Sequence, residues 1–352
     1  GGPIQRNRLW FFAPSRYTGT NNQWAGSFWN KVQGTGFYEP DLNRPGYRKE
    51  QLWAGGARLT WQASARNKVG VFADTQHNVS GGFQPFLADA PETIEGFDFW
   101  PMGLYQVTWN SPVTSRLLIE AGTSWHFNHW TTFPLPYQDT QVRPTDISTL
   151  ELSTNFRYNS AIRYRTINNT SRYAQRFSVS YVTGSHAFKV GMSTEEAPQT
   201  TKQIVYGDVN YTFLNGVPSS LTQWATPWVQ KQTLLPDLGL YAQDRWTVKR
   251  LTLNYGLRFD YLHTYVPEQP LPATQFLAAR TLGKVDCLPC WTDLSPRVGA
   301  SYDLFGNGRT ALKMSWGRYV GKTGTNIAQR ANPINTSVSN VTRTWNDANR
   351  NY

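Results

Sequence analysis

Two adjacent carboxylates, Glu195 and Glu196, are the first residues of this sequence that could support acid–base chemistry. Hydrolysis of a glycosidic bond needs two carboxylates that flank one substrate. The residues around this pair alternate in polarity as in a β-strand, where neighbouring side chains point to opposite faces. The two carboxylates therefore cannot act on one substrate, and we identify no catalytic constellation in the chain.

The other motifs that could hold a cofactor have simpler interpretations. The "GNG" at 306–308 is interpreted as a turn, because no Lys-Ser/Thr follows at the spacing of a phosphate-binding loop. His126 and His129 lie beside Trp125 and Trp130 and could bind a metal ion, but ordinary loop residues are the favoured interpretation. We therefore expect no metal site and no cofactor, and we expect that the chain is not an enzyme.

The chain has two cysteines, Cys287 and Cys290, in the stretch "DCLPCW". A zinc site would need a second pair of ligands, and a thioredoxin-like site would need a βαβ setting. The sequence offers neither, so it predicts a Cys287–Cys290 disulfide in a small loop of a protein from an oxidising compartment. A free or reactive pair is the alternative.

Long strands are the elements that must position these residues. In residues 251–262 apolar and polar side chains alternate strictly, and the apolar face carries Leu251, Leu253, Tyr255, Leu257, Phe259 and Tyr261. Such period-two alternation predicts a strand with one apolar and one polar face. Asp244 departs from the pattern, since it falls on the apolar stripe of the preceding stretch 238–248. A β-bulge is the one explanation that the sequence offers for it.

The same alternation recurs along the chain, and the lengths of the connections between its segments differ systematically. Short turns are predicted at 64–67, 110–113, 183–186, 249–250 and 306–309. Long connections rich in Gly, Pro and aromatic residues are predicted at 79–98, 128–149 and 263–294. Short turns at one end and long loops at the other are typical of an outer-membrane barrel with extracellular loops.

Strand length and aromatic placement favour the same fold. About 12 residues at ~3.3 Å each, tilted by ~45°, cover ~28 Å, enough to cross an apolar band of ~25 Å. Aromatic residues favour the headgroup level of a membrane. Large ones lie beside the short turns (Trp61, Trp109 and Trp246) and at the far strand ends (Trp53, Trp125 and Tyr261). A soluble β-sandwich or carbohydrate-binding module explains the alternation but not these two features.

Composition narrows the class further. The chain has 352 residues, 14% of them aromatic, and a mean hydropathy of −0.52. No run approaches the roughly 18 consecutive apolar residues of a membrane helix. The formal net charge is +11, but Lys and Arg are scattered singly and form no nucleic-acid-binding motif. We therefore expect no nucleic-acid partner. The opening "GGPIQRNRLWFF" has no signal-peptide pattern, which says nothing about location.

Two stretches, "LPDLGLYAQDRWTVKRLTLNYGLRFDYL" and "WTDLSPRVGASYDLFGNGRTALKMSWGRYVG", resemble the barrel of TonB-dependent outer-membrane receptors, in particular the Oar-like group. "GGPIQRNRLWFF" resembles the first barrel strand there, and "YTFLNGVPSSLTQWATP" (residues 211–227) resembles a segment of the same group. The resemblance implies an all-β, transmembrane antiparallel β-barrel with long extracellular loops. Residues 1–352 would form part of one barrel domain, with roughly 14 to 16 strands of a larger barrel and without the plug domain.

The resemblance also implies a function and partners. The leading hypothesis is a barrel of the bacterial outer membrane for TonB-coupled uptake of a ligand that the extracellular loops bind. The implied partners are outer-membrane lipid, a plug domain, the TonB complex and a metal chelate, glycan or peptide. One alternative is a receptor-like barrel for surface assembly, adhesion or protein export. A secreted carbohydrate-binding β protein is the second alternative.

Charged residues on the polar faces of the strands are the candidates for contacts with the plug or the substrate, and simple solvation is the alternative for each. They are Arg58, Arg116, Glu120, Arg176, Arg245, Arg258, Asp260 and Lys313. The candidates for ligand capture are Trp130, Tyr137 and Trp291, because binding concentrates on loops that a rigid scaffold holds.

Overall fold

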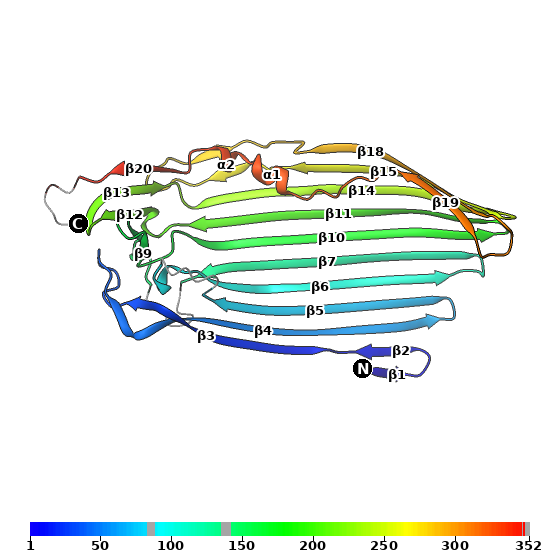
Figure 1. Ribbon diagram of the computed structural model, residues 1–352, viewed down its shortest axis with the longest axis horizontal. Helices are drawn as coiled ribbons and strands as arrows, with labels where there is room; N and C mark the ends of the chain where they lie inside the picture. The colour runs from blue at the N-terminus through cyan, green and yellow to red at the C-terminus, as the bar shows by residue number, and fades with distance from the viewer. Residues whose placement is uncertain (83–88, 135–141, 347, 349–352) are drawn as a thin grey trace.

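In the computed structural model, which describes residues 1–82, 89–134, 142–346 and 348, one antiparallel sheet runs the length of the molecule (Figure 1). The sheet contains 13 strands. In order from one edge they are β1 (Gly2–Gln5), β2 (Leu9–Phe12), β4 (Pro40–Ser64), β5 (Asn67–Gly81), β6 (Gly96–Pro112), β7 (Leu117–Phe133), β10 (Tyr164–Thr183), β11 (His186–Ile204), β14 (Trp228–Val248), β15 (Leu251–Tyr265), β18 (Cys290–Asp303) and β19 (Ala311–Gly317). The thirteenth, β3 (Ser15–Asn30), pairs with β4 beyond the end of β2. The all-β antiparallel prediction is confirmed.

The connections between these strands carry two smaller sheets. The larger has the order β20-β13-β12-β8-β9, and its members are β20 (Asn340–Thr344), β13 (Val217–Trp224), β12 (Val209–Leu214), β8 (Thr149–Glu151) and β9 (Phe156–Tyr158). The other pairs β16 (Gln269–Leu271) with β17 (Arg280–Leu282). The sequence indicated roughly 14 to 16 strands of one barrel, whereas the described residues put 13 in the large sheet and seven in these two.

Helices are few and short in the described chain. Two 3-10 turns, η1 (Pro91–Thr93) and η2 (Tyr206–Asp208), lie in the connections. Two helices, α1 (Asn326–Arg330) and α2 (Pro333–Thr336), follow β19. None of the helices in the described residues is long and apolar enough to cross a membrane.

The short turns and the long connections lie at opposite ends of the sheet, as predicted (Figure 1). The short turns are residues 6–8, 65–66, 113–116, 184–185, 249–250 and 304–310. The long connections are residues 31–39, 82–95, 134–163, 205–227 and 266–289. The predicted ranges 79–98 and 263–294 were too wide, because β5 runs to Gly81 and β6 starts at Gly96, and because β15 and β18 likewise extend into the second range. The predicted range 128–149 began and ended too early, because β7 runs to Phe133 and β10 starts at Tyr164.

Turn geometry explains why the chain reverses where it does. Gly184 and Lys249 have φ angles of 51° and 50°, in the left-handed region that tight hairpin turns use. Between β18 and β19, Gly306 and Gly308 have positive φ angles and donate their backbone N–H groups to the carboxylate of Asp303, at 3.0 and 2.9 Å. The turn residues therefore carry the conformation that hairpins require.

The two faces of the sheet differ in chemistry, as the alternation predicted. We call them the apolar face and the polar face. On the apolar face, Phe177, Val190, Met192, Leu240 and Leu257 line one shallow hollow, and Leu257 is 47% exposed although β15 is paired on both sides. Arg258, the next residue, lines a cavity on the polar face. An apolar surface of this extent is unusual on a soluble monomer and indicates contact with lipid.

The strands are longer than membrane crossing alone requires. β4 has 25 residues and β14 has 21, against about 12 expected from the band thickness. The additional strand residues lie at the end of the sheet with the long connections, which we call the loop end, and the buried side chains gather there. Trp29 and Ile94 form one small cluster there, and Ala197, Leu234 and Leu262 form another. The packed core therefore sits at the loop end and not between layers along the sheet.

The bulge predicted at Asp244 is wrong. The register of β14 against both β11 and β15 is continuous at Asp244, and the irregularities fall at Glu195/Ala197 and at Leu234/Asp237. Asp244 keeps its place on the apolar face at 5% exposure. Its carboxylate accepts hydrogen bonds from His186 Nδ1 at 2.6 Å and from the backbone N–H of Ala187 at 3.1 Å. A charged residue is thus satisfied locally without any disturbance of the strand.

Candidate functional site

A cavity of about 600 Å³ lies on the polar face, at the middle strands of the sheet. We call it the charged cavity. Its lining comes from β6, β7, β10, β11, β14, β15 and β18 and from residues 320–323. The charged side chains on its wall are Arg176, Glu195, Asp237, Arg258, Asp260, Asp293, Arg297 and Lys322. Residues of both signs of charge therefore line one polar hollow.

Ion pairs organise this wall. Arg258 Nε lies 2.7 Å from Asp260 Oδ1, two positions along the same face of β15. Glu195 is bound from two sides, by Arg172 Nε at 3.0 Å and by Lys322 Nζ. Lys322 also lies 3.9 Å from Asp237. One lysine therefore links β11 to β14 across the polar face.

Residues 318–339, which follow β19, cross the polar face back toward the loop end, and we call them the crossing segment. Figure 1 shows this part of the chain running from β19 past α1 and α2 to β20. Arg318 pairs with Asp293 at its start. Farther on, the Thr325 hydroxyl contacts Gln199 Oε1 at 3.1 Å and Asn332 Nδ2 donates to the Lys231 carbonyl at 2.8 Å. Each contact joins the segment to a different strand position, so it is fixed along its length.

A second cavity, of about 610 Å³, lies where the crossing segment meets the loop end. We call it the tryptophan cavity, because Trp130, Trp224 and Trp228 line it. Three arginines, Arg163, Arg165 and Arg330, share the wall with the amides of Asn168, Gln199, Gln203, Gln230 and Asn335. Its described lining residues include no Asp or Glu. The cavity thus combines ring surfaces and amides with a net positive charge.

The arginines of this cavity differ in how they are held. Arg165 lies over the Trp130 ring at 5.5 Å from the centroid and pairs with Glu95 at 3.5 Å. Arg163 and Arg330 are exposed and enter no ion pair in the described part of the chain. Guanidinium groups bind carboxylates and phosphates through paired hydrogen bonds, and tryptophan rings offer flat apolar surfaces. The arrangement suits a ligand that carries both an anionic group and a ring or sugar face.

The loop end is held together by a buried carboxylate in η1. Glu92 is 1% exposed and accepts hydrogen bonds from the backbone N–H groups of Asn30 and Asn159, both at 3.4 Å. Asn30 Nδ2 also donates to Asn159 Oδ1 at 3.1 Å. Burial raises the pKa of Glu92 to about 7, although these N–H groups and Arg44 oppose the rise. The end of β3 and two connections distant in sequence therefore meet at one titratable group.

A second carboxylate, Glu151 in β8, fixes the turn between β12 and β13. It accepts backbone hydrogen bonds from Asn215 and Gly216, both at 2.9 Å, and a side-chain hydrogen bond from Ser153. Desolvation opposes its charge, but these hydrogen bonds outweigh it and lower the pKa of Glu151 to about 2. This carboxylate therefore stays ionised through the physiological pH range and holds together β8, β12 and β13 of the five-stranded sheet.

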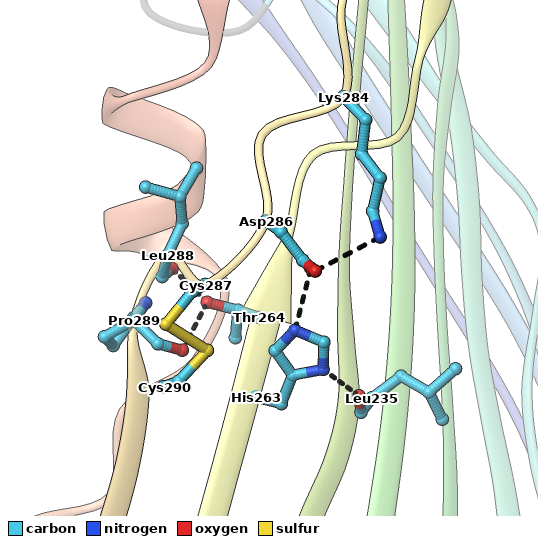
Figure 2. Close-up of a disulfide and its surroundings, with 9 residues drawn as sticks. All are labelled: Leu235, His263, Thr264, Lys284, Asp286, Cys287, Leu288, Pro289 and Cys290. Carbon is cyan, nitrogen blue, oxygen red and sulfur yellow. Dashed lines mark hydrogen bonds and ion pairs between the residues drawn. A yellow bond between two sulfur atoms is a disulfide. The ribbon is translucent and has the colours of Figure 1, made fainter.

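The connection between β15 and β18 is tied to the end of β15, as Figure 2 shows. Cys287 and Cys290 form a disulfide with a Cα–Cα distance of 4.8 Å. Beside it, the backbone N–H of Thr264 donates to the Pro289 carbonyl at 3.0 Å, and that of Leu288 donates to the Thr264 carbonyl at 2.7 Å. The disulfide thus closes a small loop that is already hydrogen-bonded to the strand.

His263 provides the second attachment of this connection (Figure 2). Its Nδ1 lies 2.9 Å from the Leu235 carbonyl oxygen and its Nε2 lies 2.9 Å from Asp286 Oδ1. The imidazole ring therefore bridges the Leu235 carbonyl of β14 and the Asp286 carboxylate of the connection. Lys284 lies 3.3 Å from the same carboxylate. The hydrogen bond from His263, together with that from Lys284, holds the pKa of Asp286 below its usual range.

The structure brings together three of the eight charged residues singled out from the sequence, since Arg176, Arg258 and Asp260 line the charged cavity. Arg245 and Lys313 line a separate hollow of about 540 Å³ nearer the short turns. The remaining three lie apart from both. Glu120 pairs with Lys189 at 3.2 Å, Arg58 is exposed in the middle of β4, and Arg116 lies in the turn before β7 and not on a strand face.

The residues expected on ligand-binding loops have different locations. Trp130 lines the tryptophan cavity, but it belongs to β7, which runs farther than predicted. Trp291 belongs to β18 and lines the charged cavity. Tyr137 lies outside the described residues. The strand ends, and not only the loops, therefore supply the aromatic rings.

Several cavity residues were missed from the sequence. Lys322 follows a strand in the stretch "GKTG", and no local pattern indicates that it returns to Glu195. Trp224 and Trp228 flank "ATP" at 225–227, where their clustering with Trp130 depends on long-range pairing. The two Trp and four Gln residues in 199–230 are the one signal that could have indicated the second cavity, and the arginines of that cavity lie outside this stretch.

Comparison with known proteins connects this arrangement to a family. A family model described as "Outer membrane beta barrel domain" matches residues 42–351. The TonB-dependent transporter Oar of Myxococcus xanthus is 30% identical over 130 residues, which are 37% of this chain and 11% of that protein. The outer membrane transporter YddB from Escherichia coli has a similar structure, with a TM-score of 0.58 at 13% identity over 92% of this chain.

A second similar structure is P. aeruginosa FpvA bound to heterologous pyoverdines, with a TM-score of 0.52 at 15% identity over 89% of this chain. At such identities the likeness concerns the fold alone. The chain spans 37% of the YddB chain and 38% of the FpvA chain. These structures therefore share the barrel architecture with the chain, which covers only part of their length.

Proposed function

Because this chain belongs to the outer membrane β-barrel domain family and so lies in the bacterial outer membrane, we propose that it binds an anionic ligand in the tryptophan cavity for TonB-coupled uptake. Its relatives are transporters and receptors, and we propose no catalytic activity for it. The location in the outer membrane removes the alternative of a secreted carbohydrate-binding protein.

The lining of the tryptophan cavity carries the proposal. Three arginines and three tryptophans surround about 610 Å³, and its described lining residues include no carboxylate. A neutral or cationic ligand would leave Arg163 and Arg330 without a partner, whereas an anionic group would pair with both. An acidic glycan, an acidic peptide and an anionic metal chelate share the chemistry that this wall recognises.

The charged cavity supports the second half of the proposal, passage of the ligand through the barrel. It lies beyond the tryptophan cavity on the polar face, and the crossing segment lines both cavities. We propose that Arg176, Arg258 and Asp260, together with Glu195 and Lys322, face the plug domain or the ligand path. Arg58, Glu120, Arg245 and Lys313 are proposed to have the same role nearer the short turns.

Ligand binding is tested with the protein purified from outer membranes in detergent. Intrinsic tryptophan fluorescence is titrated with acidic oligosaccharides, acidic peptides and ferric chelates, each paired with its neutral analogue. We expect quenching by the anionic member of one class. R163Q/R330Q should weaken that binding at least tenfold, and K189Q, on the polar face nearer the short turns, should not change it. Equal affinity for the neutral analogue would refute the anionic preference.

Uptake is tested in cells with the ligand found in that titration. Accumulation of the labelled ligand should stop when the proton-motive force is dissipated, while binding to the cell surface should persist. Binding without energy-dependent accumulation would contradict transport and favour a surface receptor.

A further inference from the structure

The end of the sheet with the short turns is strongly basic. We call the residues of the six short turns (6–8, 65–66, 113–116, 184–185, 249–250 and 304–310) the turn rim. Its charged residues are Arg6, Arg8, Arg66, Arg116, Lys249, Arg250 and Arg309, all exposed. These seven cations belong to five of the six turns, and the turns contain no Asp or Glu. The rim therefore carries a charge of +7, although each turn is only a few residues long.

The cations of the rim are not neutralised by the rest of the described chain. None of the seven enters an ion pair among the described residues, whereas arginines and lysines of the loop end and of the polar face often do. Asp303, which directly precedes the last of these turns, accepts hydrogen bonds from the backbone N–H groups of Gly306 and Gly308. Seven like charges at one end repel one another and destabilise the folded protein unless an anionic partner lies beside them.

Tryptophans fix the level of the rim relative to a membrane. Trp61 and Trp109 lie on the apolar face, and both are register partners of Val69. Trp61 is three residues from the end of β4, and Trp246 is two residues from the end of β14. Three residues at ~3.3 Å, tilted by ~45°, correspond to ~7 Å along the membrane normal. Since Trp sits at the headgroup level, the cations lie at the level of the phosphates.

We propose that the turn rim binds the phosphate groups of anionic phospholipids in the leaflet that surrounds it. Arginine forms paired hydrogen bonds with phosphate, and long cationic side chains reach headgroups from a buried or interfacial backbone. The cations are spread over turns from β1 to β19 and not gathered in one patch. That distribution suits a lipid leaflet, which meets the whole rim, better than a single acidic protein, which would meet one sector. The inference rests on the membrane location and not on ligand uptake.

The test measures retention of phosphatidylglycerol by the protein purified in a zwitterionic detergent, with native mass spectrometry as the readout. The rim variant is R66Q/R116Q/K249Q/R309Q. The matched control, K31Q/R143Q/K284Q/R343Q, removes the same charge from the loop end. Each cation near an anionic membrane surface raises the binding constant on the order of fivefold. We expect the rim variant to need at least tenfold more phosphatidylglycerol for half occupancy, and the control to stay within twofold of the wild type.

Two further measurements complete the test. Phosphatidylcholine binding should be equal in all three proteins, and lipopolysaccharide binding should not distinguish the rim variant from the control. Wild-type retention of phosphatidylglycerol by the rim variant would overturn the proposal. An equal loss of phosphatidylglycerol binding in the control would also overturn the proposal, because the binding would then depend on the total charge of the protein and not on the turn rim. Selective loss of lipopolysaccharide would assign the rim to a different anionic lipid and refute the proposal as stated.

Discussion

Tyr255 and Asp244 are direct cross-strand partners on the apolar face, and the Tyr255 hydroxyl donates to Asp244 Oδ2 at 2.8 Å. Together with His186 and the Ala187 backbone, it completes a full set of donors around a carboxylate on the lipid side of the sheet. Trp246, two positions along β14, stacks on His186 with ring centroids 5.5 Å apart. The cluster therefore sits in the aromatic zone near the short turns, where polar groups remain within reach of headgroups.

Asp244→Ala should destabilise the barrel by about 2–3 kcal/mol, because it leaves three hydrogen-bond donors without their acceptor at a largely buried site. Equilibrium unfolding by urea in lipid vesicles measures the change. Thr247→Ala, on the same strand and exposed, is the matched control and should change stability by less than about 0.5 kcal/mol. A similar loss in both variants would mean that the cluster contributes nothing specific.

Leu257→Arg should cost about 2–4 kcal/mol if Leu257 lies near the middle of the bilayer, because the charge would then sit in hydrocarbon. Arg258→Leu changes the neighbouring residue on the polar face, where its ion pair with Asp260 is partly solvated, and should cost about 1 kcal/mol or less. Refolding from urea into vesicles compares the two. Equal costs would show that the assignment of the faces is wrong.

The packing of the loop end should depend on pH through Glu92. Its pKa is raised from 4.5 to about 7 in the folded protein, so the protonated form is the one that folding favours. The contribution of Glu92 to the free energy of unfolding is therefore complete below the pKa that Glu92 has in the unfolded chain. This contribution is lost as the pH rises through about 7, and the loss is at most about 3 kcal/mol. The protection factors for hydrogen exchange of residues 30–37 and 159–161, which correct for the intrinsic base-catalysed rate, should therefore be higher at pH 5 than at pH 8.5.

Glu92→Gln provides the control for this prediction. The amide is neutral at every pH and has nearly the same shape, so the variant should lose the pH dependence of the protection factors in these residues and keep high protection at pH 8.5. Glu151→Gln should leave the difference between pH 5 and pH 8.5 unchanged, because the low pKa of Glu151 keeps it ionised at both values. Protection factors at pH 5 that are equal to or lower than those at pH 8.5 in the wild type would contradict the role of Glu92.

Replacing both Cys287 and Cys290 with Ser should loosen residues 284–290 without unfolding the barrel. The disulfide closes a ring with a sequence separation of three, and the stabilisation from a disulfide falls as the ring becomes smaller. Heat-modifiability on gels should be unchanged, while hydrogen exchange of the connection should increase. Mass spectrometry after alkylation without reductant checks the bond itself, and two alkylated thiols in fresh outer membranes would exclude it.

Cysteine labelling of intact cells should distinguish the two ends of the sheet. Single cysteines in the connections 82–95, 134–163 and 266–289 should react with a membrane-impermeant maleimide, because these connections are expected outside the cell. Single cysteines at 249–250, 113–116 and 304–310 should react only after permeabilisation. Labelling at 249–250 in intact cells would reverse the orientation.

The large sheet could be predicted from the sequence because its physical cause is local. Alternation along Leu253, Tyr255 and Leu257 determines which face each residue occupies, and turn residues such as Lys249 and Gly308 mark the reversals. Both signals are contained within one strand or one hairpin. The ends of the strands could be predicted less well, because the polar extension of β7 to Phe133 resembles a loop in composition.

The cavities could be predicted only in part. Arg176, Arg258 and Asp260 were found from alternation, because their position follows from the strand that carries them. Lys322, Trp224 and Trp228 depend on how the crossing segment and the 205–227 connection fold back, and such contacts join residues about a hundred positions apart. For Asp244 the sequence predicted the correct face of the sheet, but the β-bulge that was predicted to explain its place there is absent.

The small sheet at the loop end has a consequence for how such proteins diversify. Its strands come from the 134–163 connection, the 205–227 connection and β20, which follows the crossing segment, and β12 pairs with β8 in parallel while β13 pairs with β20. A single outer loop is therefore not an exchangeable module here, because grafting one alone would leave its partners' backbone groups unpaired. Evolutionary exchange of this outer surface would therefore have to transfer the three segments together as one block.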